Sequence, residues 1–263
     1  MKPLVLPFSL FLLLSTVAMG QEEKAVDNPQ ETSGQIEPGL HAQIMQAINR
    51  GNVDEFLKLT EGTTNKVYAG FRADVLMRRG QQRFFDADIK GSLADFDEVI
   101  ALDPDRDPYL WQRGITLYYA DKFQEGKEQF ERHQNVNDQD VENAVWHFLC
   151  AVRTPNGSVE SARKNLIPIT EDTRVPMKEV HDLFAGTGSA ETVLAAAAKE
   201  GNPEKSDKAK NSYLYAHLYL GIYYEATGNT DLMKEHIAKA AGPYKMDHYM
   251  GKVAQVHAKL RGL

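Results

Sequence analysis

The chain has 263 residues, of which 42% are hydrophobic and 25% are charged, so it lies in the ordinary globular range and can bury a substantial core. Its formal net charge is −7, and the pair Arg78-Arg79 is its densest basic stretch. Phosphate binding requires clustered Lys and Arg, so this balance argues against a nucleic-acid partner. Cys150 is the only cysteine, which excludes an intrachain disulfide.

Residues 1–20 have the features of a signal peptide. Lys2 precedes an apolar stretch from Leu4 to Val17, and Ala18 and Gly20 are small residues placed as signal peptidase requires. We therefore expect cleavage after Gly20, export to the periplasm or the extracellular space, and no membrane insertion of the mature protein. An uncleaved anchor is the alternative, because the apolar stretch is only slightly shorter than a membrane-spanning helix.

The next two segments differ in pattern. Residues 21–39 are polar and contain Pro and Gly, which predicts a disordered linker. Residues 40–72 change to helical spacing, with Ile44, Ala47 and Ile48 on one face and a break at Gly51-Asn52. A second amphipathic stretch follows, so we predict an N-terminal helical hairpin.

Residues 73–138 repeat themselves. Arg79-Gly80 and Arg113-Gly114 stand 34 residues apart, and aligning them superimposes further pairs of similar residues: Leu76 with Leu110, Phe84 with Tyr118, Ile89 with Phe123, and Phe96 with Phe130. We expect the two glycines to lie where paired helices cross, because a side chain there would hold the helices apart. We expect Phe96 and Phe130 to pack between repeats, and Pro104 to end a helix because it cannot continue the hydrogen-bond ladder.

The rest of the chain also has helical spacing. Residues 139–200 form two weaker pairs of helices, Val141–Val152 with Val159–Ile167 and Val175–Phe184 with Ala190–Ala198. Residues 211–263 contain a late repeat around Gly221, with Met233 at a position that is usually small, and then a closing helix that carries Tyr249, Val253, Val256 and Leu260 on one stripe. Strand patterns are nearly absent.

The period of 34 and the residue types resemble those of the tetratricopeptide-repeat (TPR) family. The resemblance implies an all-α fold, an αα-superhelix of TPR repeats with degenerate helical pairs and a C-terminal capping helix. Such a solenoid needs a cap because its last repeat otherwise exposes an apolar face.

The order of parts also resembles the bacterial TPR lipoproteins of the NlpI type. The similar segments are Arg113–Tyr119, Trp146–Leu149 and Tyr219–Tyr224. This resemblance implies a dimeric adaptor that brings substrates to a protease. The lipid-anchoring cysteine of those lipoproteins is missing near residue 20, so their membrane tether does not carry over.

In a TPR array, the first helices of successive repeats line a concave surface. Counting from the crossing glycines predicts eight residues on that surface: Met77, Gln81, Phe84, Phe85, Trp111, Ile115, Tyr118 and Tyr119. Aromatic side chains are enriched at binding hot spots, so these residues are the candidate partner-binding site. The alternative is that some of them pack between helices.

Other candidate sites are weaker. His147 and Cys150 share a helix face but supply too few ligands for zinc, and their apolar neighbours indicate a buried, inert pair. The stretch Gly186–Ala190 lacks the lysine of a phosphate loop, and we expect it to end one helix and cap the next. His236, His248 and His257 have no ligand spacing and are expected to be solvated or partly buried. Paired carboxylates, namely Asp95 with Asp97-Glu98 and Glu125 with Glu128, fit a solvated face.

We therefore expect no catalytic residue, no metal and no cofactor. The predicted function is a non-enzymatic protein-interaction scaffold or adaptor that binds a protein or peptide in its concave groove. The alternative is a homo-oligomeric structural component of the cell envelope, such as a homodimer whose groove is filled by the partner chain.

Overall fold

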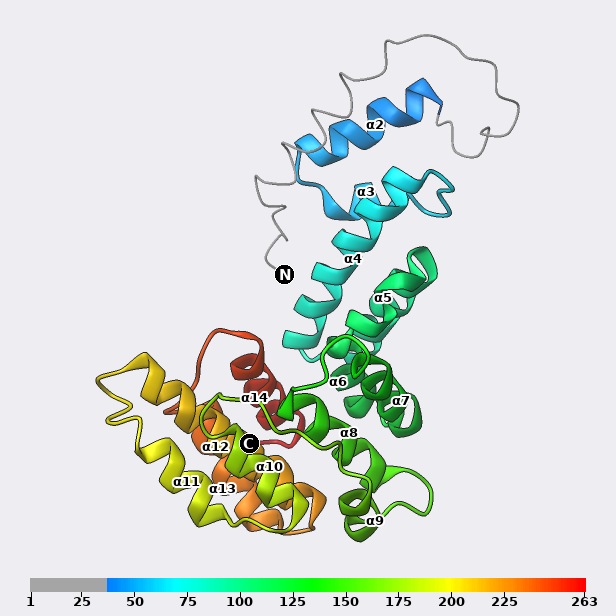
Figure 1. Cartoon of the computed structure of the whole chain (residues 1–263). Coiled ribbons are helices and arrows are strands. Elements are labelled where there is room, and N and C mark those ends of the chain that lie inside the picture. Colours follow the sequence, from blue (N-terminus) through cyan, green and yellow to red (C-terminus); the bar gives the residue numbers. More distant parts are fainter. Residues whose placement is uncertain (1–36) are drawn as a thin grey trace. The chain divides into compact units, whose positions relative to one another are not determined.

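The structure, a computed structural model, describes residues 37–263, and every regular element among them is a helix (Figure 1). This confirms the expected all-α class. The predicted signal segment 1–20 and all but the last three residues of the predicted linker 21–39 lie outside the described residues. None of the described helices combines the length and apolarity needed to cross a bilayer.

The described chain begins with α2 (Pro38–Asn49), α3 (Val53–Leu59), α4 (Lys66–Phe85), α5 (Ile89–Leu102) and the 3₁₀ helix η1 (Pro104–Tyr109). It continues with α6 (Trp111–Tyr119), α7 (Phe123–His133), α8 (Val141–Arg153), α9 (Val159–Lys164), α10 (Met177–Ala185), α11 (Ala190–Ala198), α12 (Asp207–Ala226), α13 (Thr230–Ala241) and α14 (Tyr249–Leu260). Two compact units are present, and their boundaries fall inside α4, α5 and η1. The first unit contains the residues up to Arg79 and Asp97–Pro104, and the second contains Gly80–Phe96 and Asp105–Leu263.

In the first unit, α2 packs on α3, as the predicted hairpin requires. Ile44, Ala47 and Ile48 are all buried, so the helical spacing identified the correct face. The predicted boundary at residue 73 is wrong, because α4 already begins at Lys66. Asn65 explains this start, since its side-chain oxygen accepts the backbone N–H groups of Val67 and Tyr68.

Three glycines of the second unit lie at close helix crossings. A Cβ atom on Gly80 would lie 3.0 Å from Phe96 Cε1, and one on Gly114 would lie 2.6 Å from Phe130 Cζ. The late repeat has the same arrangement, because a Cβ on Gly221 would lie 2.5 Å from Ile237 Cδ1. In all three pairs the bulky residue follows the glycine at the same interval in the chain, so the predicted positions of the crossing glycines are correct.

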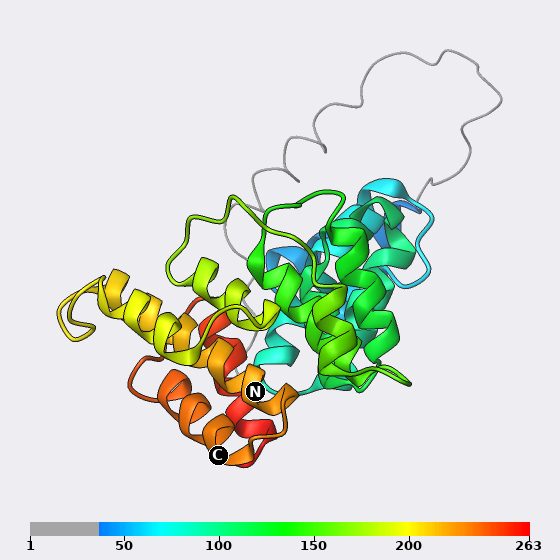
Figure 2. The ribbon, with the colours of Figure 1, turned by 60° about the horizontal axis from the view of Figure 1, so that its bottom comes forward.

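The helices of the second unit pack mainly on their neighbours in sequence, as α6 on α7, α7 on α8, and α12 on α13. Helix α12 lies at the centre, because it contacts α8, α10, α11, α13 and α14 (Figures 1 and 2). The predicted bounds of α8 and α11 agree with the structure, whereas α9 ends before its predicted end at Ile167. The largest fully buried side chains of this unit include Trp146 and Tyr219.

The Gly186–Ala190 stretch has the predicted capping role. Gly186 has φ +82°, a left-handed conformation that L side chains rarely adopt, and it ends α10. Ser189 then caps α11, since its hydroxyl and that of Thr192 each accept the other residue's backbone N–H.

Three polar residues that were expected at the surface are buried. His236 is 6% exposed and His257 is fully buried, so the prediction of solvated or partly buried histidines holds only for His248, which is exposed. Asp95 is 2% exposed and forms an ion pair of 2.8 Å with Arg83, whereas Glu125 and Glu128 are exposed as predicted. Helical spacing places carboxylates on one face but does not show whether a neighbouring arginine covers that face.

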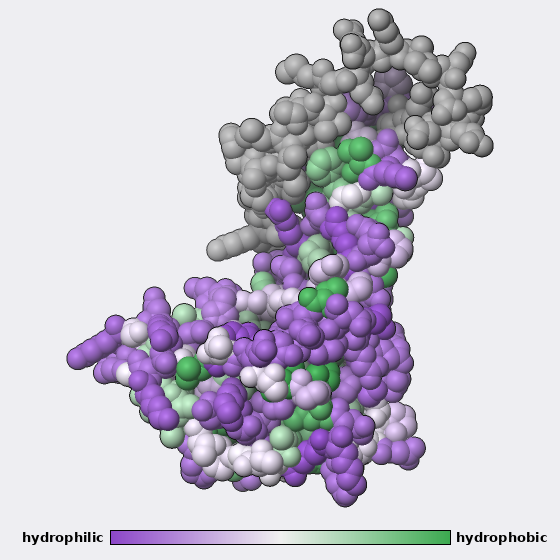
Figure 3. Space-filling view, viewed as in Figure 1, coloured by the Kyte–Doolittle hydropathy of each residue, from purple (hydrophilic) through white to green (hydrophobic). Residues whose placement is uncertain are grey.

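The molecular face drawn in Figure 3 is mostly hydrophilic over the described residues, with hydrophobic residues in small patches. Large hydrophobic side chains that are exposed in the described part of the chain lie scattered along it: Val67, Tyr109, Val136, Leu260 and Leu263. Leu260 was predicted on the apolar stripe of the closing helix and is 37% exposed instead.

Candidate functional site

The eight residues predicted to line a binding groove do not form one open surface. Phe84, Ile115 and Tyr118 are at most 2% exposed, so the prediction that they face a partner is wrong. The other five are partly buried: Met77, Gln81, Phe85, Trp111 and Tyr119.

Helix α14 of the same chain covers the aromatic row. Tyr249 stacks on Phe84 with ring centroids 5.9 Å apart and planes 9° apart, and it meets Trp111 edge-on at 4.7 Å. Tyr119 contacts His257 in the same way, at 5.8 Å. The predicted capping helix therefore packs on α13 and α12, and its rings also contact Trp111 and Tyr119 of α6. Aromatic rings gain by contacting one another, so a row of rings is a favourable surface for a helix that carries its own tyrosine.

Polar contacts also join α6 to α12 and α14, and we call this meeting point the α6–α14 junction. The hydroxyl of Tyr118 donates a hydrogen bond of 3.1 Å to Glu225, which also pairs with Arg261 at 2.5 Å. Tyr119 and His257 are hydrogen-bonded at 2.9 Å. These groups are buried or nearly so, and breaking such bonds would leave polar atoms unpaired away from water.

A cavity of about 340 Å³ remains beside this junction, within the second unit. Its lining combines aromatic, aliphatic and charged side chains: Trp111, Ile115, Phe130, His133, Asp140, Glu142, Asn143, Trp146, Arg174, Tyr215, His248, Tyr249 and Met250. Two of the predicted binding residues, Trp111 and Ile115, are among them. A ligand pocket in proteins typically measures about 300–1,000 Å³ and is largely apolar with a few placed polar groups, and this cavity has that character.

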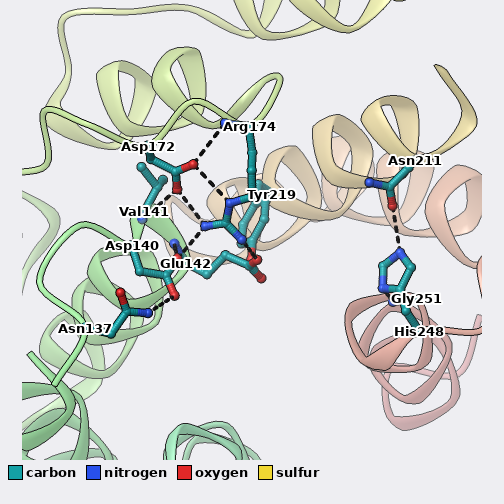
Figure 4. A network of polar contacts seen from close by, with 10 residues as sticks. All are labelled: Asn137, Asp140, Val141, Glu142, Asp172, Arg174, Asn211, Tyr219, His248 and Gly251. Carbon is teal, nitrogen blue, oxygen red and sulfur yellow. Dashed lines mark hydrogen bonds and ion pairs between the residues drawn. The ribbon is translucent and has the colours of Figure 1, made fainter. Parts of the chain in front are cut away.

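Three carboxylates converge on one arginine at the wall of this cavity (Figure 4). Arg174 lies 2.5 Å from Asp140, 2.5 Å from Glu142 and 2.6 Å from Asp172. When all four groups are ionised, two negative charges remain uncompensated. Tyr219 donates a further hydrogen bond of 2.6 Å to Glu142.

Helix caps position these groups. Asp140 caps α8 by accepting the backbone N–H of Glu142, and Asp172 accepts the N–H of Val141. Both carboxylates therefore lie at the positive amino-terminal end of α8, where negative charge is favoured. On another side of the cavity, His248 caps α14 by accepting the N–H of Gly251.

Burial changes the protonation of the cluster. It raises the pKa of Glu142 to about 7, although the Arg174 guanidinium acts in the opposite direction. Burial also acts to raise the pKa of Asp172, but hydrogen bonds from Arg174 and from the Val141 N–H outweigh it and lower that pKa. Glu142 is thus the carboxylate of this site that changes charge near neutral pH.

Three residues that line the cavity each have a buried side-chain polar atom with no partner among the described residues. These atoms are the indole N–H of Trp146, the side-chain oxygen of Asn143 and the hydroxyl of Tyr249. Asn143 donates both amide hydrogens, to the Phe130 carbonyl and to Gln134, so its oxygen is the atom left over. Buried polar groups are nearly always hydrogen-bonded, so three unpaired atoms around one cavity are unusual.

His147 and Cys150 are both buried, as predicted. His147 bonds Glu131 at 3.2 Å, and burial raises the pKa of the Cys150 thiol well above its usual value, which makes the thiol unreactive. Among residues 37–263, no three His, Cys, Asp or Glu side chains are grouped closely enough to hold a metal ion.

No protein-family model matches this chain, and no curated protein is significantly similar to it.

The sequence interpretation missed most of the polar wall. Asp140 and Glu142 flank the start of the helix that contains Trp146. Acidic residues in this position were a usable signal for a charged wall beside the tryptophan. Arg174 follows more than 30 residues later, in a segment without helical periodicity, and no local pattern relates it to Glu142.

Proposed function

We propose that this chain is a TPR-type scaffold that binds a peptide segment of a partner protein and catalyses no reaction. The fold assignment rests on the period of 34 and on the glycine crossings at Gly80, Gly114 and Gly221. The signal-peptide pattern of residues 1–20 supports export as part of the same proposal.

The cavity between α6, α8, α12 and α14 is the observation that carries the binding function. Its walls supply large aromatic surface, which contributes much binding free energy at low entropic cost. This cavity takes the place of the wider groove in our proposal, because α14 packs on the aromatic part of that groove.

Peptide selection tests the proposal. A displayed library of random peptides is selected on the immobilised full-length chain, and the enriched peptides are measured on two variants. Trp111→Ala removes a ring that lines the cavity, and we expect at least tenfold weaker binding. Tyr109→Ala is the matched control, because Tyr109 is 62% exposed on η1 and does not line the cavity.

Circular dichroism and light scattering on both variants accompany the selection. The proposal is wrong if no peptide is enriched, or if the enriched peptides bind Trp111→Ala as tightly as wild type. The alternative of a homo-oligomeric structural component predicts a different result, in which Trp111→Ala changes the molecular mass in solution and no peptide is selected.

A further inference from the structure

We infer that the cavity beside α14 holds the side chain of a lysine residue from the bound peptide. This inference rests on the proposed function and adds the chemistry of the group that enters the cavity. It has two independent supports: the aromatic walls of the cavity, and the excess of carboxylates over cations in the cluster at its wall.

The walls suit an alkyl chain that ends in a cation. Five residues with phenyl, phenol or indole rings line the cavity: Trp111, Phe130, Trp146, Tyr215 and Tyr249. Aromatic faces attract an ammonium group through their quadrupole, most strongly where water is excluded, and they also pack against methylene groups. A lysine side chain has both parts, because its four methylenes carry the charge away from the backbone.

The charge of the wall selects a cation over an anion. Arg174 faces three carboxylates, those of Asp140, Glu142 and Asp172, of which the first two line the cavity, and its guanidinium compensates only one of them. Burial raises the pKa of Glu142 to about 7, so this carboxylate carries its full negative charge above that pH. Lys and other Arg residues are absent from the lining, and the two remaining titratable side chains there besides tyrosine are His133 and His248. His248 accepts the Gly251 N–H on one ring nitrogen and bonds Asn211 with the other, which leaves it neutral (Figure 4). His133 bonds the carbonyl of Pro108.

The occupied carboxylate oxygens favour lysine over arginine. Arg174 already occupies the paired carboxylate oxygens that match a planar guanidinium. A compact ammonium with three rotatable donors does not need a pair of parallel acceptor oxygens, whereas the rigid fork of a second guanidinium does.

Tryptophan signals give a direct test, because Trp111 and Trp146 are the only two tryptophans in the chain and both line the cavity. The probe is a short peptide with blocked ends that carries one lysine. Matched peptides carry norleucine or arginine at that position. Each is titrated into the full-length protein while indole fluorescence and the two indole N–H resonances are recorded.

We expect the lysine peptide to move the Trp146 N–H resonance and to bind at least tenfold more tightly than the norleucine peptide. At pH 8, above the raised pKa of Glu142, Glu142→Gln removes one negative charge and should weaken the lysine peptide at least tenfold, while leaving the norleucine peptide unchanged. Glu125→Gln is the matched control, since it makes the same chemical change at an exposed position of α7.

Equal affinities for lysine and norleucine peptides would overturn the inference while leaving peptide binding by the cavity intact. Tighter binding of the arginine peptide would overturn it in favour of a guanidinium ligand. If library-selected peptides bind but none of them changes either indole signal, the ligand lies elsewhere and the inference fails. If library selection also yields no peptide, the proposed function itself fails.

Discussion

The hydroxyl of Tyr118 on α6 donates a hydrogen bond to Glu225 near the end of α12, across 107 residues of chain. Tyr249, which packs on the same aromatic row, has a buried hydroxyl with no partner among the described residues. The Tyr118 hydroxyl thus has a hydrogen-bond partner and the Tyr249 hydroxyl has none. Replacing each tyrosine with phenylalanine should therefore change the free energy of unfolding by different amounts.

Tyr118→Phe should lower the free energy of unfolding by about 1–3 kcal/mol, because it leaves the buried Glu225 carboxylate with one partner fewer. Tyr249→Phe should be neutral or slightly stabilising, because it removes a hydroxyl that is desolvated without compensation. Thermal and urea denaturation followed by circular dichroism measure both. Equal losses in the two variants would contradict the hydrogen-bond assignment.

Glycine substitutions test the helix crossings. Gly114→Ala should destabilise the protein by about 1–3 kcal/mol, since its Cβ would lie 2.6 Å from the Phe130 ring and force the core to shift. Gly70→Ala is the matched control on α4, where no atom lies within 4 Å of the added Cβ, and it should stabilise by about 0.5–1 kcal/mol. Denaturation midpoints that move in the same direction would show that the crossing does not depend on glycine.

Acid should weaken the protein through the buried His217–His236 pair, whose Nδ1 atoms are 2.8 Å apart. Burial, together with His236 and Lys239, lowers the pKa of His217 to about 3, although Glu235 acts to raise it. The folded state therefore binds fewer protons than the unfolded state below pH 6.5, so this stability is present above that pH and is lost as the pH falls toward about 3.

The variant His217→Asn isolates this effect. The advantage of wild type over the variant in free energy of unfolding should fall by on the order of 2 kcal/mol between pH 7.5 and 4.5. Denaturation at both pH values gives the difference. An advantage that stays constant, or grows in acid, would contradict the assignment of the pair as neutral.

Glu142 should have the opposite pH dependence. Its pKa rises from 4.5 to about 7 through burial, so the folded state holds an extra proton in that window. The contribution of Glu142 to the free energy of unfolding is therefore fully present below pH 4.5, and it is lost as the pH rises through about 7. The free energy of unfolding of Glu142→Gln, measured relative to that of wild type, should therefore rise by on the order of 2–3 kcal/mol between pH 4 and pH 8.

Parallel denaturation curves of wild type, Glu142→Gln and the exposed control Glu125→Gln measure this gain. A Glu142→Gln variant that loses stability relative to wild type as the pH rises would show that the ionised carboxylate is stabilised by Arg174 more than burial opposes it.

The helical class, the crossing glycines and the capping role of Gly186–Ser189 were predictable because they depend on local chemistry. Helical spacing, a missing side chain and a serine before an alanine-rich helix act within a few turns of the chain. The start of α4 was missed although Asn65 is a residue type that favours N-caps, so a local signal was present there as well.

The amino-acid sequence alone was sufficient to place aromatic side chains on one face of α6 and to show that α14 carries an apolar stripe that begins with Tyr249. It did not show that these two surfaces pack together, because they lie more than a hundred residues apart and either could have faced solvent or another chain. Their contact turned Phe84, Ile115 and Tyr118 from predicted binding residues into core. The same long-range packing brought Arg174 to Glu142 and left the Trp146 N–H unpaired, since burial and partners depend on which elements meet, and hydrophobic spacing along one helix does not specify its neighbour.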